Sequence, residues 1–444
     1  MAESTAIPTR TLVFGASGYI GSHLVPRLLA AGHRLRATAR HRGVLEGRGW
    51  DGVELVAADA LQPDTLDAVL EGVEVAYYLV HSMGAGADFA SRDRAAAEAF
   101  RGAAERAGVR RIIYLGGLQP PSNTSEHLES RRETGAVLAG GPVQVIEVRA
   151  GIVVGPGSAA FEVIRDLVFH LPLMTTPRWV RSRSQPIALD DLLEYLTRLA
   201  TVKIAGHRIF DVGGADTLRY SDMLRQFGVV VGRPVRIIAL PVLTPRLSSY
   251  WLDLVTAVPA SVARPLVDGL KHDLLANDAP IRALIPIPLM TYREAVEADL
   301  WSEVTAVGGR NGWHYLDILW ELRGLIDRVF GGIGMRRGRR DPTSLRVGDA
   351  LDFWRVVELR PGRLLSLVAE MKLPGSAVLE FDVQPAAGGG SRLVTTARYH
   401  PAGILGLLYW YALTPIHTPL FRGLTRALCR RAEARYDAEP MQKA

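Results

Sequence analysis

The chain has 444 residues, of which 48% are hydrophobic and 22% are charged, and its formal net charge is +6 at pH 7. This length exceeds what one hydrophobic core usually serves, and the composition excludes a fibrous or disordered chain, so we expect two or three compact domains. Arginine carries almost all of the positive charge, a bias typical of a high-GC genome rather than of a nucleic-acid-binding surface, and no nucleic-acid partner is expected.

Two further features concern the compartment. Cys429 is the single cysteine, which excludes an internal disulfide and favours a reducing environment. Residues 1–10 contain no apolar run of the length that a signal peptide needs. The sequence therefore predicts a cytoplasmic protein.

The segment from residue 11 to residue 40 has the pattern of an apolar strand, a glycine turn, a helix and a second strand. Gly15, Gly18 and Gly21 have the spacing that brings a backbone close to a pyrophosphate, at a helix N-terminus that presents free N–H groups to it. The second strand ends in Arg40 and not in an acid that would bind a ribose 2′-hydroxyl. Because an arginine there can neutralise a 2′-phosphate, the sequence predicts an NADP(H) site.

Strand-like and helical segments alternate through the first part of the chain. The strand-like runs are Leu12–Phe14, Leu35–Ala39, Glu54–Ala58, Val75–Val80, Ile112–Leu115 and Val143–Val148. Repeated units of this kind require a parallel sheet with helices on both faces, and its ligand crevice lies beyond the carboxyl ends of the strands. From about residue 151 to residue 300 the pattern loosens into many prolines and short elements. We expect this region to cap the carboxyl edge and to supply a substrate pocket.

From about Leu345 the chain changes character. Four strand-like runs separated by Pro-Gly and glycine-rich turns predict an antiparallel meander, followed by a helix that packs across it. No Asp, Glu, Lys or Arg occurs from Tyr399 to Phe421, but prolines and histidines interrupt this stretch, and its contiguous apolar core is only Ile404–Leu413. We therefore expect a buried or interfacial helix and no transmembrane span, with peripheral membrane contact left open.

Several segments, in this order, resemble the extended and atypical short-chain dehydrogenase/reductases, in particular the NmrA-like branch. They are GASGYIG at 15–21, the strand ending in Arg40, AADALQPDTL, YYLVHSM, RIIYLGGL, EVRAGIVVGPGS and QPIALDD. The resemblance implies a Rossmann-type doubly wound parallel sheet over residues 1–300, with a substrate-capping region from about residue 151. Residues 301–444 resemble the α+β helix-grip domain fused to some bacterial members.

The resemblance also implies residues that hold the cofactor. Arg40 would contact the 2′-phosphate, Asp59 and Ala60 the adenine edge, and His81 and Ser82 the ribose on the nicotinamide side. The pyrophosphate would be held by Gly15, Ser17, Gly18, Tyr19, Ile20 and Gly21.

The family's reducing chemistry normally uses a Tyr-x-x-x-Lys pair and a Ser or Thr at the end of the fifth strand. This chain departs from that pattern at all three positions. The fifth strand ends in Gly116 and Gly117, and aligning the segment SEHLESRRETG with the family places His127 at the tyrosine position and Arg131 at the lysine position. A histidine can transfer a proton near neutral pH, and an arginine on the same helix face can hold ribose hydroxyls. Tyr114 is an alternative hydroxyl donor, and a purely structural His127 stays open.

Three functions remain. The first is an NADP(H)-dependent oxidoreductase acting on a hydrophobic small molecule, either a ketone or an activated C=C bond. The replaced triad also permits a non-catalytic NADP(H)-binding redox sensor or scaffold. The third is a lipid- or polyketide-binding or cyclase-type role of the C-terminal domain. The sequence shows no metal-ligand spacing, and it fixes neither the substrate nor the oligomeric state.

Overall fold

The computed structural model describes residues 10–434 with gaps at 82–87, 121–124, 156–157, 172, 177, 231–233, 240–271, 306, 308–312, 314–319, 321–344, 361, 372–373 and 386–390. The chain divides into two compact units. The first comprises residues up to Met223 together with Ile237–Tyr292, and the second comprises Leu224–Arg236 together with the residues from Arg293 onward.

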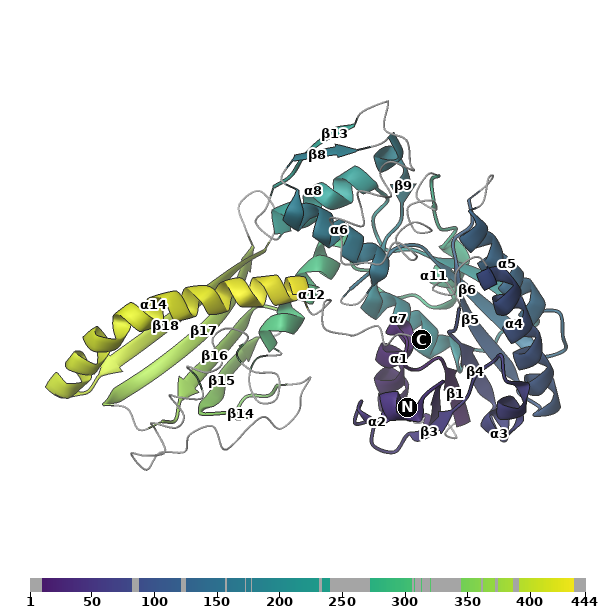
Figure 1. Ribbon diagram of the computed structural model, residues 1–444, viewed down its shortest axis with the longest axis horizontal. Helices are drawn as coiled ribbons and strands as arrows, with labels where there is room; N and C mark the ends of the chain where they lie inside the picture. Colours follow the sequence, from purple (N-terminus) through teal and green to yellow (C-terminus); the bar gives the residue numbers. More distant parts are fainter. Residues whose placement is uncertain are drawn as a thin grey trace. The chain divides into compact units, whose positions relative to one another are not determined.

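A seven-stranded parallel sheet is the framework of the first unit (Figure 1). Its strands stand in the order β11-β6-β5-β4-β1-β2-β3, so the chain reverses its direction of winding between the neighbours β1 and β4. The strands are β1 (Arg10–Phe14), β2 (Arg34–Ala39), β3 (Glu54–Ala57), β4 (Val75–Tyr78), β5 (Arg111–Gly117), β6 (Gln144–Ala150) and β11 (Arg208–Val212). The predicted doubly wound parallel sheet is thus confirmed.

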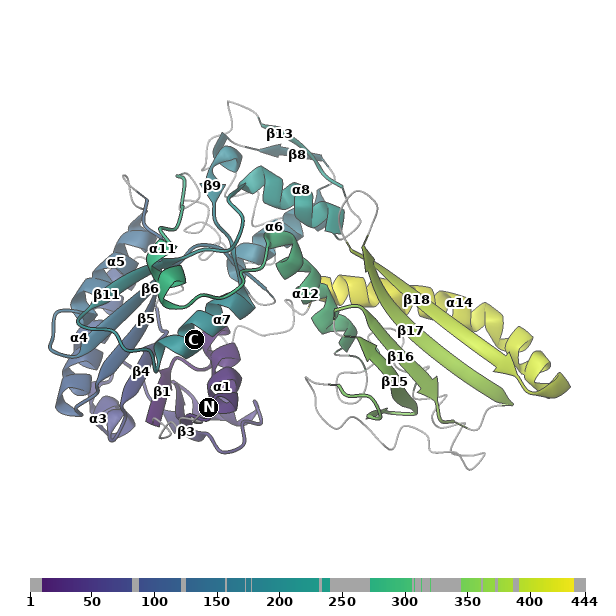
Figure 2. The same ribbon diagram turned by 180° about the vertical axis from the view of Figure 1, so that it is seen from behind.

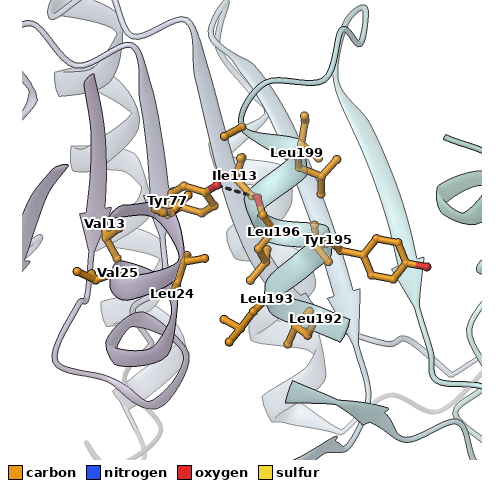
Figure 3. Close-up of a cluster of buried hydrophobic side chains, with 14 of the residues drawn as sticks. Val13, Leu24, Val25, Tyr77, Ile113, Leu192, Leu193, Tyr195, Leu196 and Leu199 are labelled. Atoms are coloured by element: carbon orange, nitrogen blue, oxygen red, sulfur yellow. Dashed lines mark hydrogen bonds between the residues drawn. The ribbon is translucent and has the colours of Figure 1, made fainter. Parts of the chain in front are cut away.

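Helices cover both faces of this sheet, because alternate side chains of each strand face opposite sides. The helices of this unit's sheet are α1 (Tyr19–Ala30), α2 (Arg42–Glu46), α3 (Leu66–Leu70), α4 (Phe89–Arg106), α5 (Glu126–Leu138) and α7 (Leu189–Leu199). Val13 and Tyr77 pack with α1 and α7 in one cluster, and the Tyr77 hydroxyl donates to the carbonyl of Leu196 at 2.7 Å (Figure 3). On the other face, Phe14 and Tyr78 lie 5.0 and 4.9 Å from the ring of Phe100 in α4.

Short elements follow β6, as the loosened sequence pattern predicts. Three two-stranded ladders join β10 to β7, β12 to β9 and β13 to β8. These elements are β7 (Val153–Val154), α6 (Ala159–His170), β8 (Leu173–Thr176), β9 (Arg183–Ser184), β10 (Ile187–Ala188), β12 (Leu218–Arg219), α8 (Tyr220–Val230), β13 (Arg236–Ala239), α11 (Ala279–Leu284) and α12 (Tyr292–Thr305).

The second unit contains a five-stranded antiparallel sheet in chain order with a long helix along it (Figure 2). The strands are β14 (Ala350–Leu351), β15 (Trp354–Arg360), β16 (Leu364–Ala369), β17 (Gly375–Pro385) and β18 (Ser391–Pro401), and the helix is α14 (Gly403–Ala434). The predicted meander and its following helix are confirmed. Trp313, Trp320 and Trp354 are buried in the core of this unit.

The prolines do not divide α14 as the sequence suggested. Pro415 and Pro419 lie inside one continuous helix, although a proline removes an N–H donor and normally kinks a helix. Burial of Leu420, Leu424 and Leu428 in the core beyond them shows that packing on the sheet outweighs this local cost. Among the helices of the described ranges, none is long and apolar enough to cross a membrane.

Candidate functional site

The glycine turn after β1 is shaped by close packing. Gly15 has a φ of +94°, and a Cβ there would lie 2.8 Å from Cγ1 of Val80. A Cβ on Gly21 would lie 2.4 Å from the carbonyl oxygen of Gly15, so only glycine lets α1 approach the strand end this closely. Gly18 differs, because its φ is −72° and a Cβ would meet only the Gly15 oxygen, at 3.3 Å. A side chain at position 18 therefore requires only a small shift of the Gly15 carbonyl, which is less than a side chain at position 21 requires.

The N-terminus of α1 offers unpaired donors. The first N–H bonded within the helix is that of Ser22, which donates to Gly18 at 2.9 Å, so the N–H groups of Ile20 and Gly21 precede the helical ladder. The first turn of α1 contains no acidic side chain. Together with the positive end of the helix dipole, these groups form a site for an anion such as a pyrophosphate.

Arg40 and Asp59 lie at the same edge of the sheet. Arg40 directly follows β2, is exposed, and takes part in no ion pair or hydrogen bond among the described residues, whereas the nearby Arg42 pairs with Glu46 at 2.9 Å. Asp59 accepts the N–H of Leu61 at 3.0 Å, so one of its carboxylate oxygens already serves a turn. The guanidinium of Arg40 is available for a phosphate.

A cavity of about 360 Å³ opens at the carboxyl ends of β4, β5 and β6, beside the glycine turn. On the side of α1 the cavity is lined by Gly18, Tyr19, Ile20 and Gly21. Ser82, a candidate from the sequence, lies outside the described residues. The rest of the lining consists of Leu79, Val80, His81, Leu115, Gly116, Gly117, Leu118, His127, Leu128, Arg131, Ala150, Gly151, Ile152, Val153, Ser158, Ala159, Ala160, Val163, Tyr220 and Leu274.

The structure brings His81, His127 and Arg131 together in this cavity. The hydroxyl of Ser125 caps α5 by accepting the N–H of Leu128 at 3.4 Å. His127 and Arg131 lie in the first two turns of this helix, four residues apart and therefore on the same face. The ring centroids of His81 and His127 lie 6.5 Å apart. The Arg131 guanidinium donates to the carbonyl of Leu115, while its buried Nε has no hydrogen-bond partner among the described residues. That orphaned donor fits a polar ligand in the cavity.

Both imidazoles are held neutral. Burial, followed by the charge of Arg131, lowers the pKa of His127 to about 4. Desolvation, Arg131 and His127 also lower the pKa of His81, although part of this side chain is exposed to solvent. At neutral pH each ring therefore has one N–H donor and one acceptor nitrogen and carries no charge. This environment favours a hydrogen-bond donor over an imidazolium acid.

The two glycines that end β5 are explained by their neighbours. A Cβ on Gly117 would lie 3.0 Å from Cδ2 of Leu128, so this α5 side chain takes the space of a larger residue. A Cβ on Gly116 would lie 3.0 Å from Oε1 of Glu147, a buried carboxylate on β6 that pairs with Arg149 at 2.6 Å. Burial raises the pKa of Glu147 despite this pairing. Nothing in the local sequence pointed to this carboxylate.

Tyr114 is placed in the core of the sheet and does not line the cavity. Its side chain is 2% exposed, and its hydroxyl donates to the carbonyl of Arg131 at 3.0 Å. Burial raises the pKa of Tyr114 to about 12. A catalytic role for Tyr114 stays a prediction, and its visible contact is one that positions α5.

The apolar wall of the cavity was not recognised from the sequence. Leu118, Ile152, Val163 and Leu274 come from four separate elements or loops. Leu118 and Ile152 lie in the quoted segments RIIYLGGL and EVRAGIVVGPGS, whereas Val163 and Leu274 belong to no motif. In the part of the chain that the structure describes, no group of His, Cys, Asp and Glu side chains could hold a metal ion.

These features define an α/β domain in which an anion-binding helix N-terminus borders a largely apolar cavity. Residues 15–138 match a family described as NAD(P)H-binding, and residues 290–424 match a family of proteins of unknown function, DUF2867. The chain thus combines an N-terminal region that matches an NAD(P)H-binding family with a C-terminal region that matches DUF2867.

Two similar proteins and one solved structure extend the comparison. Ceramide reductase of Caulobacter vibrioides is 28% identical over 287 residues, which cover 62% of this chain and 88% of that protein. Sterol demethylase protein B of Methylococcus capsulatus is 32% identical over 133 residues, covering 26% of this chain and 38% of that protein. The solved structure of Citrobacter sp. triphenylmethane reductase with NADP(H) superposes with a TM-score of 0.54 at 17% identity, covering 65% of this chain and 99% of that one, which shows the shared fold. The chain is similar to NAD(P)H-dependent reductases.

Proposed function

We propose that the protein is an NADPH-dependent reductase that reduces a polar double bond, such as a ketone, on an apolar, lipid-like small molecule. One observation carries the proposal: His127 and Arg131 line the same cavity as the anion-binding N-terminus of α1. The similarity to a ceramide reductase and the apolar wall of the cavity support a lipid-like substrate. Arg40, which is exposed and has no partner among the described residues, supports the choice of NADPH over NADH.

The residues of the chain divide the work. The nicotinamide, when bound, supplies the hydride. The α1 N-terminus holds the pyrophosphate, and the Arg131 Nε–H, which has no protein acceptor in the described part of the structure, donates to a polar group of the cofactor or the substrate. The neutral His127 imidazole donates its N–H to the substrate oxygen and so stabilises the negative charge that develops there during hydride transfer. Water then supplies the proton that converts this oxygen to a hydroxyl.

The test is NADPH oxidation by the purified protein with a long-chain keto lipid, a short-chain ketone and an enone. We expect turnover of the keto lipid, and we expect His127→Ala to lower kcat by roughly 10²–10³-fold with little change in NADPH affinity, because the donor acts on the transition state. Arg131→Ala should instead weaken NADPH or substrate binding. His400→Ala, which removes an exposed histidine of the second unit, is the matched control.

Other outcomes point elsewhere. Full turnover by His127→Ala would assign the stabilisation of the substrate oxygen to another group. If no substrate is turned over and NADPH still raises the melting temperature, the redox-sensor function is favoured. For the second unit we retain a helix-grip-like architecture, which the antiparallel sheet and its long helix support.

A further inference from the structure

The first three turns of α14 have two different apolar faces. One face packs on the sheet: a Cβ on Gly406 would lie 2.3 Å from the carbonyl oxygen of Pro374, and the Trp410 ring stacks on Tyr399 with centroids 5.3 Å apart. The other face is open. Its four large apolar residues are Ile404, Leu407, Leu408 and Tyr411, which are 77%, 45%, 63% and 72% exposed.

These four residues form one stripe, because the spacing i, i+3, i+4 and i+7 follows the helical repeat. A helix that lies on a sheet normally presents polar side chains to water on its outer face. Here the outer face is apolar over about two turns, and large exposed apolar patches on proteins mark interaction sites. We call this set, Ile404, Leu407, Leu408 and Tyr411, the outer stripe.

The distribution of charge along α14 indicates what covers the outer stripe. No Asp, Glu, Lys or Arg occurs from Tyr399 to Phe421, whereas the last 13 residues of the helix, Arg422–Ala434, contain four arginines and one glutamate. Arg422 is exposed and lies 18 residues, or five helical turns, after Ile404, so it continues the same face. The face therefore passes from aliphatic and aromatic groups to a basic end.

An anionic lipid bilayer offers complementary groups, because its apolar acyl chains lie next to negatively charged headgroups. Aliphatic side chains enter the boundary between acyl chains and headgroups, a tyrosine is favoured at the interface, and arginines pair with lipid phosphates. We propose that the outer stripe and Arg422 of α14 form a peripheral binding surface for an anionic bilayer. The inference stands apart from the reductase activity, since its residues belong to the second unit alone.

Sedimentation with vesicles tests the surface on the full-length chain. We expect the protein to bind vesicles of equal parts phosphatidylglycerol and phosphatidylcholine more tightly than vesicles of phosphatidylcholine alone, with binding weakened by salt. The double variant Ile404→Ser, Leu408→Ser should lower the binding on the order of tenfold or more, because two aliphatic anchors are removed. Arg422→Gln should reduce the preference for anionic vesicles by several-fold.

The matched control is Val347→Ser, Val357→Ser, which removes two other exposed aliphatic residues of the same unit, 62% and 44% exposed. It should bind vesicles like the unchanged protein. The proposal is overturned if neither vesicle binds the unchanged protein, or if the control loses as much binding as the stripe variant. A dimer that light scattering detects and that only the stripe variant abolishes, without vesicle binding, would assign the stripe to a second copy of the chain. Melting followed by tryptophan fluorescence checks that the second unit of each variant is folded, because five of the eight tryptophans belong to that unit.

Discussion

At the scale of single residues, we expect the cofactor preference to depend on Arg40. Its guanidinium is exposed and without a protein partner in the described ranges, directly after β2. We expect Arg40→Asp to weaken NADPH on the order of tenfold to a hundredfold and to leave NADH as the better ligand, because the change removes a charge-assisted contact and adds repulsion. Titration of both nucleotides into both proteins measures this. An unchanged preference would assign the 2′-phosphate to another residue, and Arg42→Asp, at an arginine already paired with Glu46, is the control.

The depressed pKa of His127 makes the stability of the protein dependent on pH. Its pKa is about 4 in the folded protein against an ordinary value of 6.5, so between these values the unfolded chain binds more protons than the folded one. The free energy of unfolding therefore falls as the pH is lowered from about 6.5 toward 4. Because glutamine does not titrate, we expect the decrease in the free energy of unfolding between these pH values to be smaller in His127→Gln by up to about 3 kcal/mol.

Melting curves at neutral pH and near pH 4 check the expectation. The difference in melting temperature between the two conditions should be smaller for His127→Gln than for the unchanged protein. His400→Gln, at an exposed histidine, should behave like the unchanged protein. Equal pH dependence in all three proteins would show that His127 is not held neutral.

At the scale of elements, two glycines in the turn between β1 and α1 are expected to serve different purposes, one in NADPH binding and the other in folding. Gly18 has an ordinary φ, and a Cβ there would lie 3.3 Å from the Gly15 oxygen, whereas a Cβ on Gly21 would lie 2.4 Å from the same atom. We expect Gly18→Val to abolish NADPH binding by filling the space over the helix N-terminus while the fold survives with a modest drop in melting temperature, and Gly21→Val to destabilise the fold much more. Calorimetric titration and thermal melting distinguish the two. NADPH affinity near that of the unchanged protein in a folded Gly18→Val variant would contradict this placement of the phosphate.

Elements with a local signature were predictable from the sequence, and arrangements that depend on distant neighbours were not. Six strands of the first sheet followed from short apolar runs between helical segments, whereas β11 was not among the predicted runs, and the glycine spacing predicted the turn before α1. The cavity wall was hidden because Leu118, Val163 and Leu274 meet only after folding. The neutrality of His127 likewise arises from burial by other elements, and the continuity of α14 through Pro415 and Pro419 arises from packing on the sheet.

At the scale of the whole molecule, two separate cores predict two responses to ligand. Five of the eight tryptophans belong to the second unit, so tryptophan fluorescence reports mainly on it, while calorimetry reports on both units. We expect NADPH at about a thousandfold its Kd to stabilise the first unit by about 4 kcal/mol and to leave the fluorescence-detected melting of the second unit unchanged. Gly18→Val should show no shift in either transition. A joint shift of both transitions would show that the units unfold as one.

The helix that carries His127, α5, is held against its neighbours by contacts of residues that follow His127 in the sequence. The Tyr114 hydroxyl holds the carbonyl of Arg131, the Ser130 hydroxyl donates to Asp93 at 3.3 Å, and Gly135 lies so close to Glu147 that a Cβ would be 2.4 Å from its Oε2. The side chain at position 127 can therefore be exchanged without releasing α5 from the sheet. Over evolutionary time such an anchored helix can substitute one reactive group for another while its scaffold is inherited unchanged, and this offers a physical route by which a tyrosine-based site gives way to a histidine-based one.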